Sequence, residues 1–147
     1  MSPTVVEDKI AVHELLSEYV FRTDACDWRG VAALFTEDGE FRGRIGQATG
    51  PQQIGDLLVS MNPTATSGPK RRHLTTNSLI KVDGDRATAR STYMVFIDRG
   101  DGPHPIIFGT YEDDLVRVVP GQAEWMFRRR LLVHDIVSDD IGLNKKV

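Results

Sequence analysis

Hydrophobic residues recur every three or four positions over the first part of the chain. No proline interrupts this stretch after Pro3, and Glu and Lys residues stand between the hydrophobic positions. The pattern predicts one long helix from Thr4 to about Cys26, and its wide hydrophobic arc indicates burial on more than one side. The hydrophobic positions are Val5, Val6, Ile10, Val12, Leu15, Leu16, Tyr19, Val20 and Phe21.

A short second helix and a short strand are predicted next. Asp27 can cap the helix, because hydrophobic residues follow it at helical spacing. Residues 37–39, two acidic residues and a glycine, predict a turn, and residues 40–45 predict a short strand. The hydrophobic face of the second helix would consist of Trp28, Val31, Ala32 and Phe35.

A third helix is predicted after Thr49-Gly50-Pro51, because a cap residue followed by an early-turn proline is typical of helix starts. Asn62-Pro63 ends this helix, and a loop rich in Pro, Thr, Ser and Gly runs on to Lys70. Long loops of this kind often border sites. The helical repeat comprises Ile54, Leu57, Leu58 and Met61.

After His73 the hydrophobic period changes to two, which is typical of strands. The alternation continues to Val82, and Asp83-Gly84 then predicts a hairpin turn into a return strand at about 86–97. One face of the first strand would carry Leu74, Thr76, Ser78, Ile80 and Val82, and one face of the return strand would carry Ala87, Ala89, Ser91, Tyr93, Val95 and Ile97.

Two more long strands are predicted at about 106–119 and 124–133, after a polar connection at 98–105. The residues after 135 predict a loose, polar tail. Helices followed by a meander of long strands predict the α+β class, with an antiparallel sheet that curves against the long helix and leaves a concave pocket. The 147 residues suit a single domain with one core.

The charge balance favours no strongly charged partner. The chain carries 18 basic and 21 acidic side chains, and its formal net charge of -3 gives no field that selects nucleic acid or an anionic membrane. Cys26 is the only cysteine, which excludes an internal disulfide and fits a reducing compartment. The N-terminal residues lack a signal-peptide pattern and no stretch is apolar enough for a membrane span, so we expect a cytoplasmic protein.

Several familiar motifs are absent from the sequence. There is no His-Glu-x-x-His or cysteine pair for zinc, no Gly-x-Gly-x-x-Gly for a dinucleotide and no Gly-x-Ser-x-Gly for a nucleophilic serine. The basic triplets at 70–72 and 128–130 lack interleaved aromatic residues. The first could bind a phosphate but is more typical of a solvated loop, and in the second one or two of the three arginines are expected to face water. We therefore expect no cofactor, no metal and no nucleic-acid partner.

The candidate chemistry rests on Asp24, near the end of the first helix, and His73, at the start of the first long strand. A neutral imidazole can take a proton near pH 7, and a carboxylate bonded to its other nitrogen would fix its tautomer and stabilise the imidazolium. If the fold brings the two together in the pocket, they form a general-base dyad. The alternatives are that Asp24 caps the helix end and that His73 is a partly exposed strand residue.

A base alone does not suffice for a carbon acid, because the negative charge that develops on the substrate needs a donor. Tyr19 and Arg130 are the candidates. Five helix positions rotate the chain by about 140°, so Tyr19 and Asp24 border one pocket only if it wraps around the helix end. The candidate wall residues, which favour a ring-containing and mostly uncharged substrate, are Trp28, Met61, Tyr93, Phe96, Phe108 and Tyr111.

Several stretches together resemble the SnoaL-like branch of the nuclear transport factor 2-like superfamily. They are Asp24–Trp28, Gly50-Pro51, His73, the Gly-x-Tyr-x-x-x-Leu-x-Arg pattern at Gly109–Arg117 and the Trp-x-Phe-x-x-Arg pattern at Trp125–Arg130. The resemblance covers roughly residues 5–136 and implies one domain over 1–147. It implies a cone-shaped α+β barrel of three N-terminal helices on a curved, mostly antiparallel sheet with a central pocket, and a homodimer or homotrimer.

Within this superfamily the chain is similar to scytalone dehydratase, bile-acid 7α-dehydratase and hexachlorocyclohexane dehydrochlorinase, which use an Asp and a His at the positions of Asp24 and His73. Tyr19 and Arg130 also stand at matching positions, whereas His134 at the end of the last strand is not expected in the pocket. The resemblance implies a cofactor-free lyase or isomerase that dehydrates, or moves a double bond in, a small hydrophobic steroid- or polyketide-like compound.

The same fold hosts other functions, so two alternatives stay open. One is a non-catalytic role, either as a ligand-binding protein or as a structural protein like the small subunit of ring-hydroxylating oxygenases. A cavity filled by side chains would indicate the subunit role. The other is an epoxide hydrolase or a polyketide cyclase, for which Glu112, Asp113 or Asp114 would have to point into the pocket.

Overall fold

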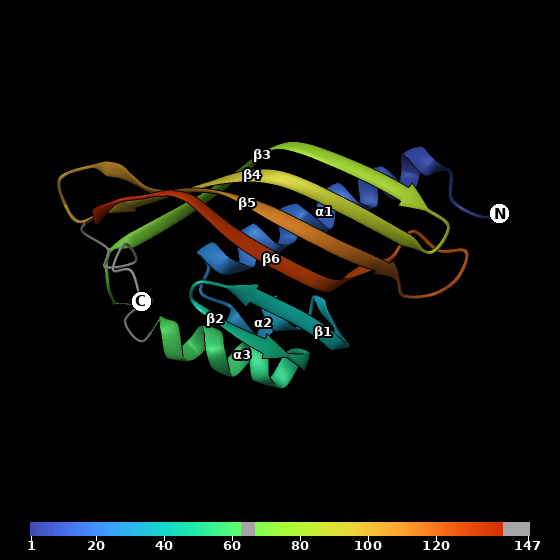
Figure 1. The fold of residues 1–147 in the computed structure, drawn as a ribbon, viewed down its shortest axis with the longest axis horizontal. Coiled ribbons are helices and arrows are strands. Elements are labelled where there is room, and N and C mark those ends of the chain that lie inside the picture. The colour runs from blue at the N-terminus through green and yellow to red at the C-terminus, as the bar shows by residue number, and fades with distance from the viewer. Residues whose placement is uncertain (63–66, 140–147) are drawn as a thin grey trace.

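The computed structural model describes residues 1–62 and 67–139, which form three helices and a six-stranded sheet (Figure 1). The α+β architecture expected from the sequence is confirmed. The elements are α1 (Val5–Asp24), α2 (Trp28–Ala32), β1 (Phe35–Gly43), β2 (Gly46–Thr49), α3 (Gly50–Met61), β3 (Lys70–Asp83), β4 (Arg86–Asp98), β5 (Pro103–Arg117) and β6 (Trp125–Val137).

Helix α1 begins at a capping box and ends at a left-handed turn. The Thr4 hydroxyl accepts a hydrogen bond from the Glu7 backbone N–H at 3.2 Å, and the Glu7 carboxylate accepts one from the Thr4 backbone. At the other end Cys26 has a φ of 57°, which ends the helix after Asp24. Asp27 then caps α2, as predicted, by accepting a backbone N–H at 2.9 Å. The turn leaves Asp24 at the tip of α1, where its carboxylate can reach the sheet.

Helix α2 is shorter than predicted, and the predicted turn at 37–39 lies within β1 instead. Strand β1 pairs in parallel with β6, and its register shifts between Phe35 and Glu40. More residues lie between these two positions on β1 than between their partners on β6, so the extra residues bulge out and the strand continues without a reversing turn. Strand β2 then leads directly into α3, which carries Pro51 in its first turn as predicted.

The sheet has the order β2-β1-β6-β5-β4-β3, and every neighbouring pair except β1 and β6 is antiparallel. The four long strands curve over α1, which covers their inner face (Figure 1). Antiparallel strands with one covered face show period two, which is why the sequence reveals the faces of β4. The predicted face is confirmed, because Ala87, Ala89, Ser91, Tyr93, Val95 and Ile97 are all buried.

The predicted faces of β3 are wrong for its first half. The register with β4 shifts once, between Thr76 and Leu79, where Asn77 adopts a φ of 51°. One extra residue at such a bulge reverses which side chains face inward, and Asn tolerates the left-handed conformation. His73 therefore lies on the same inner side as Ile80, whereas Leu74 is half exposed.

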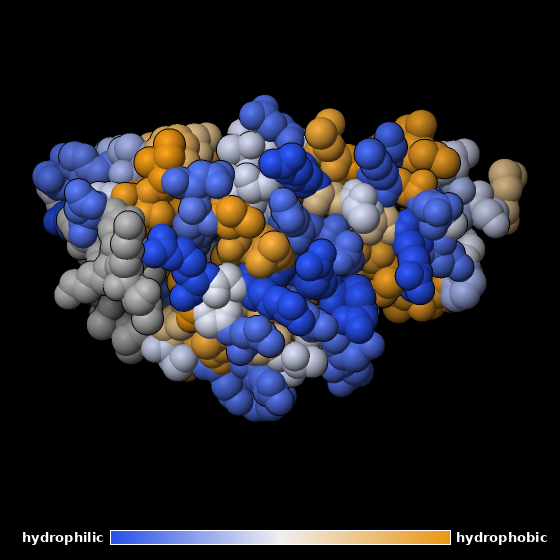
Figure 2. Space-filling view, in the orientation of Figure 1, coloured by the Kyte–Doolittle hydropathy of each residue, from blue (hydrophilic) through white to orange (hydrophobic). Residues whose placement is uncertain are grey.

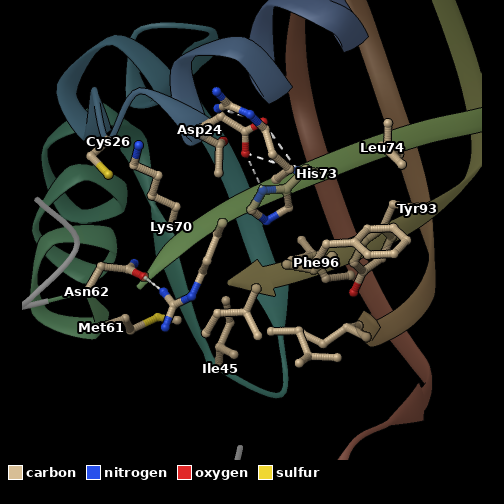
Figure 3. Close-up of a pocket in the computed structure, with 18 of the residues that line it drawn as sticks. Asp24, Cys26, Ile45, Met61, Asn62, Lys70, His73, Leu74, Tyr93 and Phe96 are labelled. Atoms are coloured by element: carbon tan, nitrogen blue, oxygen red, sulfur yellow. Dashed lines mark hydrogen bonds and ion pairs between the residues drawn. The ribbon is translucent and has the colours of Figure 1, made fainter. Parts of the chain in front are cut away.

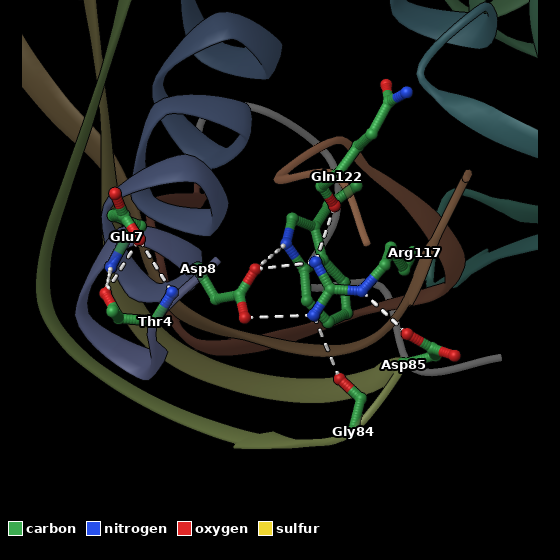
Figure 4. Close-up of polar contacts among 8 residues, drawn as sticks. Thr4, Glu7, Asp8, Gly84, Asp85, Arg117 and Gln122 are labelled. Atoms are coloured by element: carbon green, nitrogen blue, oxygen red, sulfur yellow. Dashed lines mark hydrogen bonds and ion pairs between the residues drawn. The ribbon is translucent and has the colours of Figure 1, made fainter. Parts of the chain in front are cut away.

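A buried ion pair holds the first turn of α1 against the sheet (Figure 4). Arg117, at the end of β5, donates from Nη1 and Nη2 to the carboxylate oxygens of Asp8 at 2.8 and 2.9 Å. The indole N–H of Trp125 bonds to the same carboxylate at 3.2 Å, and Arg117 Nε bonds to Asp85 at 2.7 Å. Two residues of the strand motifs, Arg117 and Trp125, thus have a structural role at the opposite end of α1 from Asp24.

The strands extend further than their hydrophobic patterns indicate. Strand β4 runs to Asp98 and β5 starts at Pro103, so the predicted polar connection is only a short hairpin loop. Strand β6 continues to Val137, and the rest of the predicted tail, residues 140–147, lies outside the described residues, as do residues 63–66 of the predicted loop before β3. Within the described part of the chain, no helix is long and apolar enough to cross a bilayer.

Hydrophilic side chains gather over the middle of the outer face of the sheet, with some hydrophobic side chains beside them (Figure 2). On this face Arg129 donates from Nε to Asp114 at 2.7 Å, and Arg128 donates to the backbone carbonyl of Asp38 at 2.9 Å. Two of the three arginines at the end of the Trp-x-Phe-x-x-Arg segment therefore point outward, and only the third turns toward the core.

Candidate functional site

A cavity of about 960 Å³ lies between the C-terminal ends of α1 and α3 and the concave face of the sheet (Figure 3). Its walls are hydrophobic and aromatic side chains with a small number of polar groups among them. The volume is at the upper end of the range typical of small-molecule sites. The cavity is open space rather than a region filled by side chains.

Asp24 and His73 meet at this cavity (Figure 3). Asp24 Oδ1 lies 2.7 Å from His73 Nδ1, and the His73 backbone N–H also donates to the carboxylate, at 3.1 Å to Oδ1 and 3.3 Å to Oδ2. The side chains of Asp24 and His73 are 8% and 17% exposed. Because Nδ1 faces the carboxylate, the ring proton belongs on Nδ1 and the lone pair on Nε2 is left for a ligand.

Three features of the fold bring these two residues together. The turn after α1 places Asp24 at the helix tip, β3 packs along α1, and the bulge at Asn77 sets the inner face of β3. Because Asp24 bonds to both the backbone and the ring of His73, it also ties the edge strand β3 to α1. Arg72 Nη1 lies 3.7 Å from Asp24 Oδ2, but the Arg72 side chain is 74% exposed, so solvent screens that pair.

Tyr19 also lines the cavity, although about 140° of helix rotation separates it from Asp24. The cavity wraps around the end of α1, where Thr23 and Cys26 line it too. The Tyr19 ring is buried and stands edge-on to Tyr111, with ring centroids 5.9 Å apart. Burial raises the pKa of Tyr19, so its hydroxyl stays protonated.

Arg130 does not line the cavity, which differs from its expected role as a donor to the substrate. Its side chain is fully buried, and Nε and Nη2 each lie 2.8 Å from a carboxylate oxygen of Asp113 on β5. Its Cζ is 4.0 Å from the ring centroids of Tyr19 and Tyr111 and 4.3 Å from that of Phe127. These contacts enclose the guanidinium, so Arg130 has a structural role behind the cavity wall.

The predicted wall residues lie at the cavity with one exception. Phe108 is absent from the lining: it stands on β5 between Ile107, which lines the cavity, and Gly109, which faces inward against the Tyr93 ring. Successive strand residues point to opposite faces, so Phe108 points outward. The wall residues that do line the cavity are Trp28, Met61, Tyr93, Phe96 and Tyr111.

His134 lines the cavity as a second histidine, contrary to expectation. Sequence reasoning misses it because the hydrophobic pattern of the last strand weakens after Val133, whereas β6 runs on to Val137. Its spacing of two from Leu132, which is buried, would have predicted that His134 lies on the same face of the strand. Burial, and then the positive charge of Arg44, lower the pKa of His134.

The acidic residues that a cyclase or epoxide hydrolase would need do not line the cavity. Asp113 points inward but is paired with Arg130, Asp114 pairs with Arg129, and Glu112 borders a groove on the outer face. Among residues 1–62 and 67–139, no group of three His, Cys, Asp or Glu side chains stands where it could hold a metal ion.

A family model of the SnoaL-like domain matches residues 4–131. The chain belongs to the SnoaL-like family. A search of curated proteins gives no significant match. Family membership and the open cavity together support a role in binding a small ligand or in isomerase- or dehydratase-type chemistry.

Solved structures of the same fold match this SnoaL-like chain over most of its length. An Asp-to-Asn variant of Rv3472 from Mycobacterium tuberculosis, a protein of unknown function, is 29% identical with a TM-score of 0.74 and covers 90% of this chain and 75% of its own. ActVI-ORFA from Streptomyces coelicolor is 27% identical with a TM-score of 0.75, covering 86% and 97%. A candidate scytalone dehydratase from Novosphingobium aromaticivorans, 24% identical with a TM-score of 0.73 and covering 89% and 86%, shares the fold.

Proposed function

We propose that this SnoaL-like protein is a cofactor-independent lyase or isomerase in which His73 takes a proton from carbon in a small ring-containing, steroid- or polyketide-like substrate. The observation that carries the proposal is the 2.7 Å contact between Asp24 Oδ1 and His73 Nδ1 at a cavity of about 960 Å³. An imidazole held by a carboxylate through one nitrogen presents the other for proton transfer. The aromatic walls of the cavity favour a ring compound.

In the proposed reaction a C–H bond next to a carbonyl breaks, its proton moves to His73 Nε2, and the electron pair moves into the carbonyl as an enolate. Asp24 stabilises the imidazolium that forms. In a dehydration the enolate expels a hydroxyl from the β-carbon, and the imidazolium gives its proton to that oxygen, which leaves as water. In an isomerisation the imidazolium returns the proton to a different carbon. Both reactions regenerate neutral His73.

The enolate oxygen requires a hydrogen-bond donor, and Tyr19 is the proposed one. It lines the cavity together with Asp24, and its raised pKa keeps the hydroxyl protonated. Arg130 is not proposed for this role, because its guanidinium is enclosed by Asp113 and aromatic rings. Loss of a comparable donor costs on the order of 10²–10³ in rate in other enzymes, and Tyr19→Phe tests this contribution here.

The test separates the base from the contact that holds it. In His73→Asn the side-chain amide nitrogen can replace Nδ1 and keep the bond to Asp24, but the base Nε2 is gone. We expect this variant to keep the melting temperature of the wild type and to lose about 10²–10⁴ of its rate. Nuclear magnetic resonance in D₂O measures the rate, as deuterium exchange at the α-carbon of ring ketones and as water loss from β-hydroxy ring ketones.

A second Asp–His pair in the chain supplies the matched control. His104 Nε2 lies 3.2 Å from Asp101 Oδ2 in an exposed pair outside the cavity lining, so His104→Asn should keep the wild-type rate. Asp24→Asn completes the set and should lower the rate as well. Undiminished exchange in both His73→Asn and Asp24→Asn would reject the general-base role. Tight binding of ring compounds without exchange or water loss would favour a non-catalytic ligand-binding protein.

A further inference from the structure

One wall of the cavity carries two polar atoms without a hydrogen-bond partner in the described part of the chain. They are the hydroxyl of Tyr93 on β4 and Nδ1 of His134 on β6, and both are closed to solvent. Both residues line the cavity, and Tyr93 is only 2% exposed. A buried hydroxyl or ring nitrogen without a hydrogen bond is costly, so native proteins normally supply a partner for it.

A glycine between them explains how these two residues face the same space. Tyr93 pairs with Gly109, and Gly109 pairs with His134, so the three stand in one row across β4, β5 and β6. A Cβ at Gly109 would lie 2.5 Å from Cε1 and 2.7 Å from Cζ of Tyr93. The Tyr93 ring therefore lies across β5 toward β6, and it meets the His134 ring edge-on with centroids 6.2 Å apart.

The position of this pair relative to His73 suits a ring-sized ligand. His73 pairs with Val95, which is two positions from Tyr93 on the inner face of β4. The Cα atoms of diagonal neighbours of this kind lie about 7–8 Å apart. His134 stands two strands beyond Tyr93, but its ring is only 6.2 Å from the Tyr93 ring between centroids. Figure 3 shows Tyr93 on the sheet wall beyond His73. A ligand of two or three fused rings can reach from His73 to the pair.

We propose that the rings of Tyr93 and His134 shift toward the cavity when a ligand enters, because their polar atoms are closed even to water in the empty cavity. The two residues then bind a neutral oxygen substituent on the ring of the ligand, a hydroxyl or a ketone, and so fix its orientation. A ring hydroxyl would accept from Tyr93 and donate to His134 Nδ1, and a ketone would accept from both residues. This proposal rests on the proposed function only in taking the cavity as the ligand site.

The protonation states of the two residues support a neutral oxygen. Burial raises the pKa of Tyr93, which keeps its proton available for donation. Burial also lowers the pKa of His134, which keeps the imidazole uncharged. Two neutral groups in a closed wall offer a matched hydrogen bond to a hydroxyl or ketone, but no charge to offset that of a carboxylate.

The test compares ligands of matched shape with and without an oxygen. Binding of 2-naphthol, 1-tetralone and naphthalene to the full chain is measured by isothermal titration calorimetry. We expect the wild type to prefer at least one oxygenated compound over naphthalene by about 10-fold, and Tyr93→Phe and His134→Leu each to weaken its binding about 5- to 10-fold with naphthalene affinity unchanged. Preference for 2-naphthol identifies a hydroxyl site, and preference for 1-tetralone a ketone site.

Ser91→Ala is the matched control. The Ser91 hydroxyl is also buried on the inner face of β4 and has no partner among residues 1–62 and 67–139, but Ser91 does not line the cavity. Its removal should leave the preference unchanged. All three variants should melt no lower than the wild type, because each removes an unbonded polar group and Tyr93→Phe keeps the ring.

Two results would overturn the proposal: a wild type that does not distinguish the oxygenated compounds from naphthalene, or a preference that survives in both Tyr93→Phe and His134→Leu. Asp24→Asn separates this proposal from the proposed function. This variant should keep the preference for oxygenated ligands while it loses turnover. The binding proposal and the proposed catalytic function can therefore fail independently.

Discussion

Arg130 on β6 and Asp113 on β5 form an ion pair with two parallel contacts in a space closed to solvent. The Nε–Oδ1 and Nη2–Oδ2 distances are both 2.8 Å, and both side chains are 0% exposed. On its aromatic side the guanidinium contacts Tyr19 and Tyr111, whose rings line the cavity. The pair therefore positions part of the cavity wall without touching the ligand space.

Removal of one member of this pair should destabilise the protein strongly. Arg130→Met leaves the Asp113 carboxylate buried without a counter-charge, which costs about 3–5 kcal/mol of unfolding free energy. The double variant Arg130→Met/Asp113→Leu should lose less than the single one, because it removes both charges. Urea denaturation measures both values.

The exposed neighbouring pair is the control for this prediction. Arg129 lies 2.7 Å from Asp114, with side chains 37% and 46% exposed, so Arg129→Met should cost less than about 1 kcal/mol. Equal costs for Arg129→Met and Arg130→Met would show that the buried pair has no special structural weight.

The Asp8–Arg117 pair predicts a loss of stability in acid. Hydrogen bonds from Arg117 lower the pKa of Asp8 below its usual 3.8. A carboxyl whose folded pKa is depressed contributes stability above its unfolded pKa and loses it as pH falls through the folded pKa. Asp8→Asn should therefore cost about 3 kcal/mol at pH 7 and progressively less below about pH 4.

Guanidinium denaturation at pH 7 and pH 3 checks this dependence. Glu14→Gln, which alters an exposed carboxylate on the same helix, should change stability little at either pH. A cost for Asp8→Asn that is the same at both pH values would mean that charge pairing with Arg117 is not its source.

The sequence predicts those parts of the fold in which side-chain periodicity is undisturbed. The inner face of β4 follows from strict alternation because one face of the strand is covered and the extra residues at its register shifts lie on the neighbouring strands β3 and β5. The faces of β3 do not follow, because the left-handed Asn77 shifts the register by one residue. A single Asn among strand-forming residues is not enough to predict such a bulge.

The candidate site was likewise predictable from the sequence only in part. Asp24 and His73 could be paired from residue type and family position, although their contact also depends on the bulge at Asn77, which the sequence does not predict. The sequence does not show which way Arg130 points, because strand β6 carries three consecutive arginines and its register with β5 shifts near Asp114. His134 was hidden for a related reason: pairing with β5 extends the strand beyond its hydrophobic run.

Gly109→Ala should disturb both stability and the cavity. The added Cβ would meet the Val133 carbonyl oxygen at 2.3 Å and the Tyr93 ring at 2.5 Å, and the first of these is backbone that cannot rotate away. Forcing extra volume into a packed site typically costs about 1–3 kcal/mol. Thermal melting measures the cost, and the near-ultraviolet circular dichroism of the stacked Tyr93 and Tyr111 rings, whose centroids are 4.1 Å apart, should change.

Thr110→Ala is the control for Gly109→Ala, because Thr110 is adjacent and bonds to Asp135 at 3.2 Å in an exposed pair. It should cost less than about 1 kcal/mol and leave the aromatic signal unchanged. A Gly109→Ala protein with wild-type melting and an unchanged aromatic spectrum would contradict the close approach of Tyr93 to β5.

His134 should make the folded state sensitive to mild acid. Burial holds its pKa below the usual 6.5, so the unfolded chain takes up a proton at this residue before the folded chain does. The contribution of His134 to stability is therefore fully present above about pH 6.5 and is lost as pH falls toward the folded pKa. In His134→Gln this part of the pH dependence should vanish, whereas His104→Gln, at an exposed position, should keep it. Nuclear magnetic resonance titration of the imidazole protons gives the folded pKa directly, and a His134 resonance that titrates at or above 6.5 would show that the ring is not held neutral by the cavity wall.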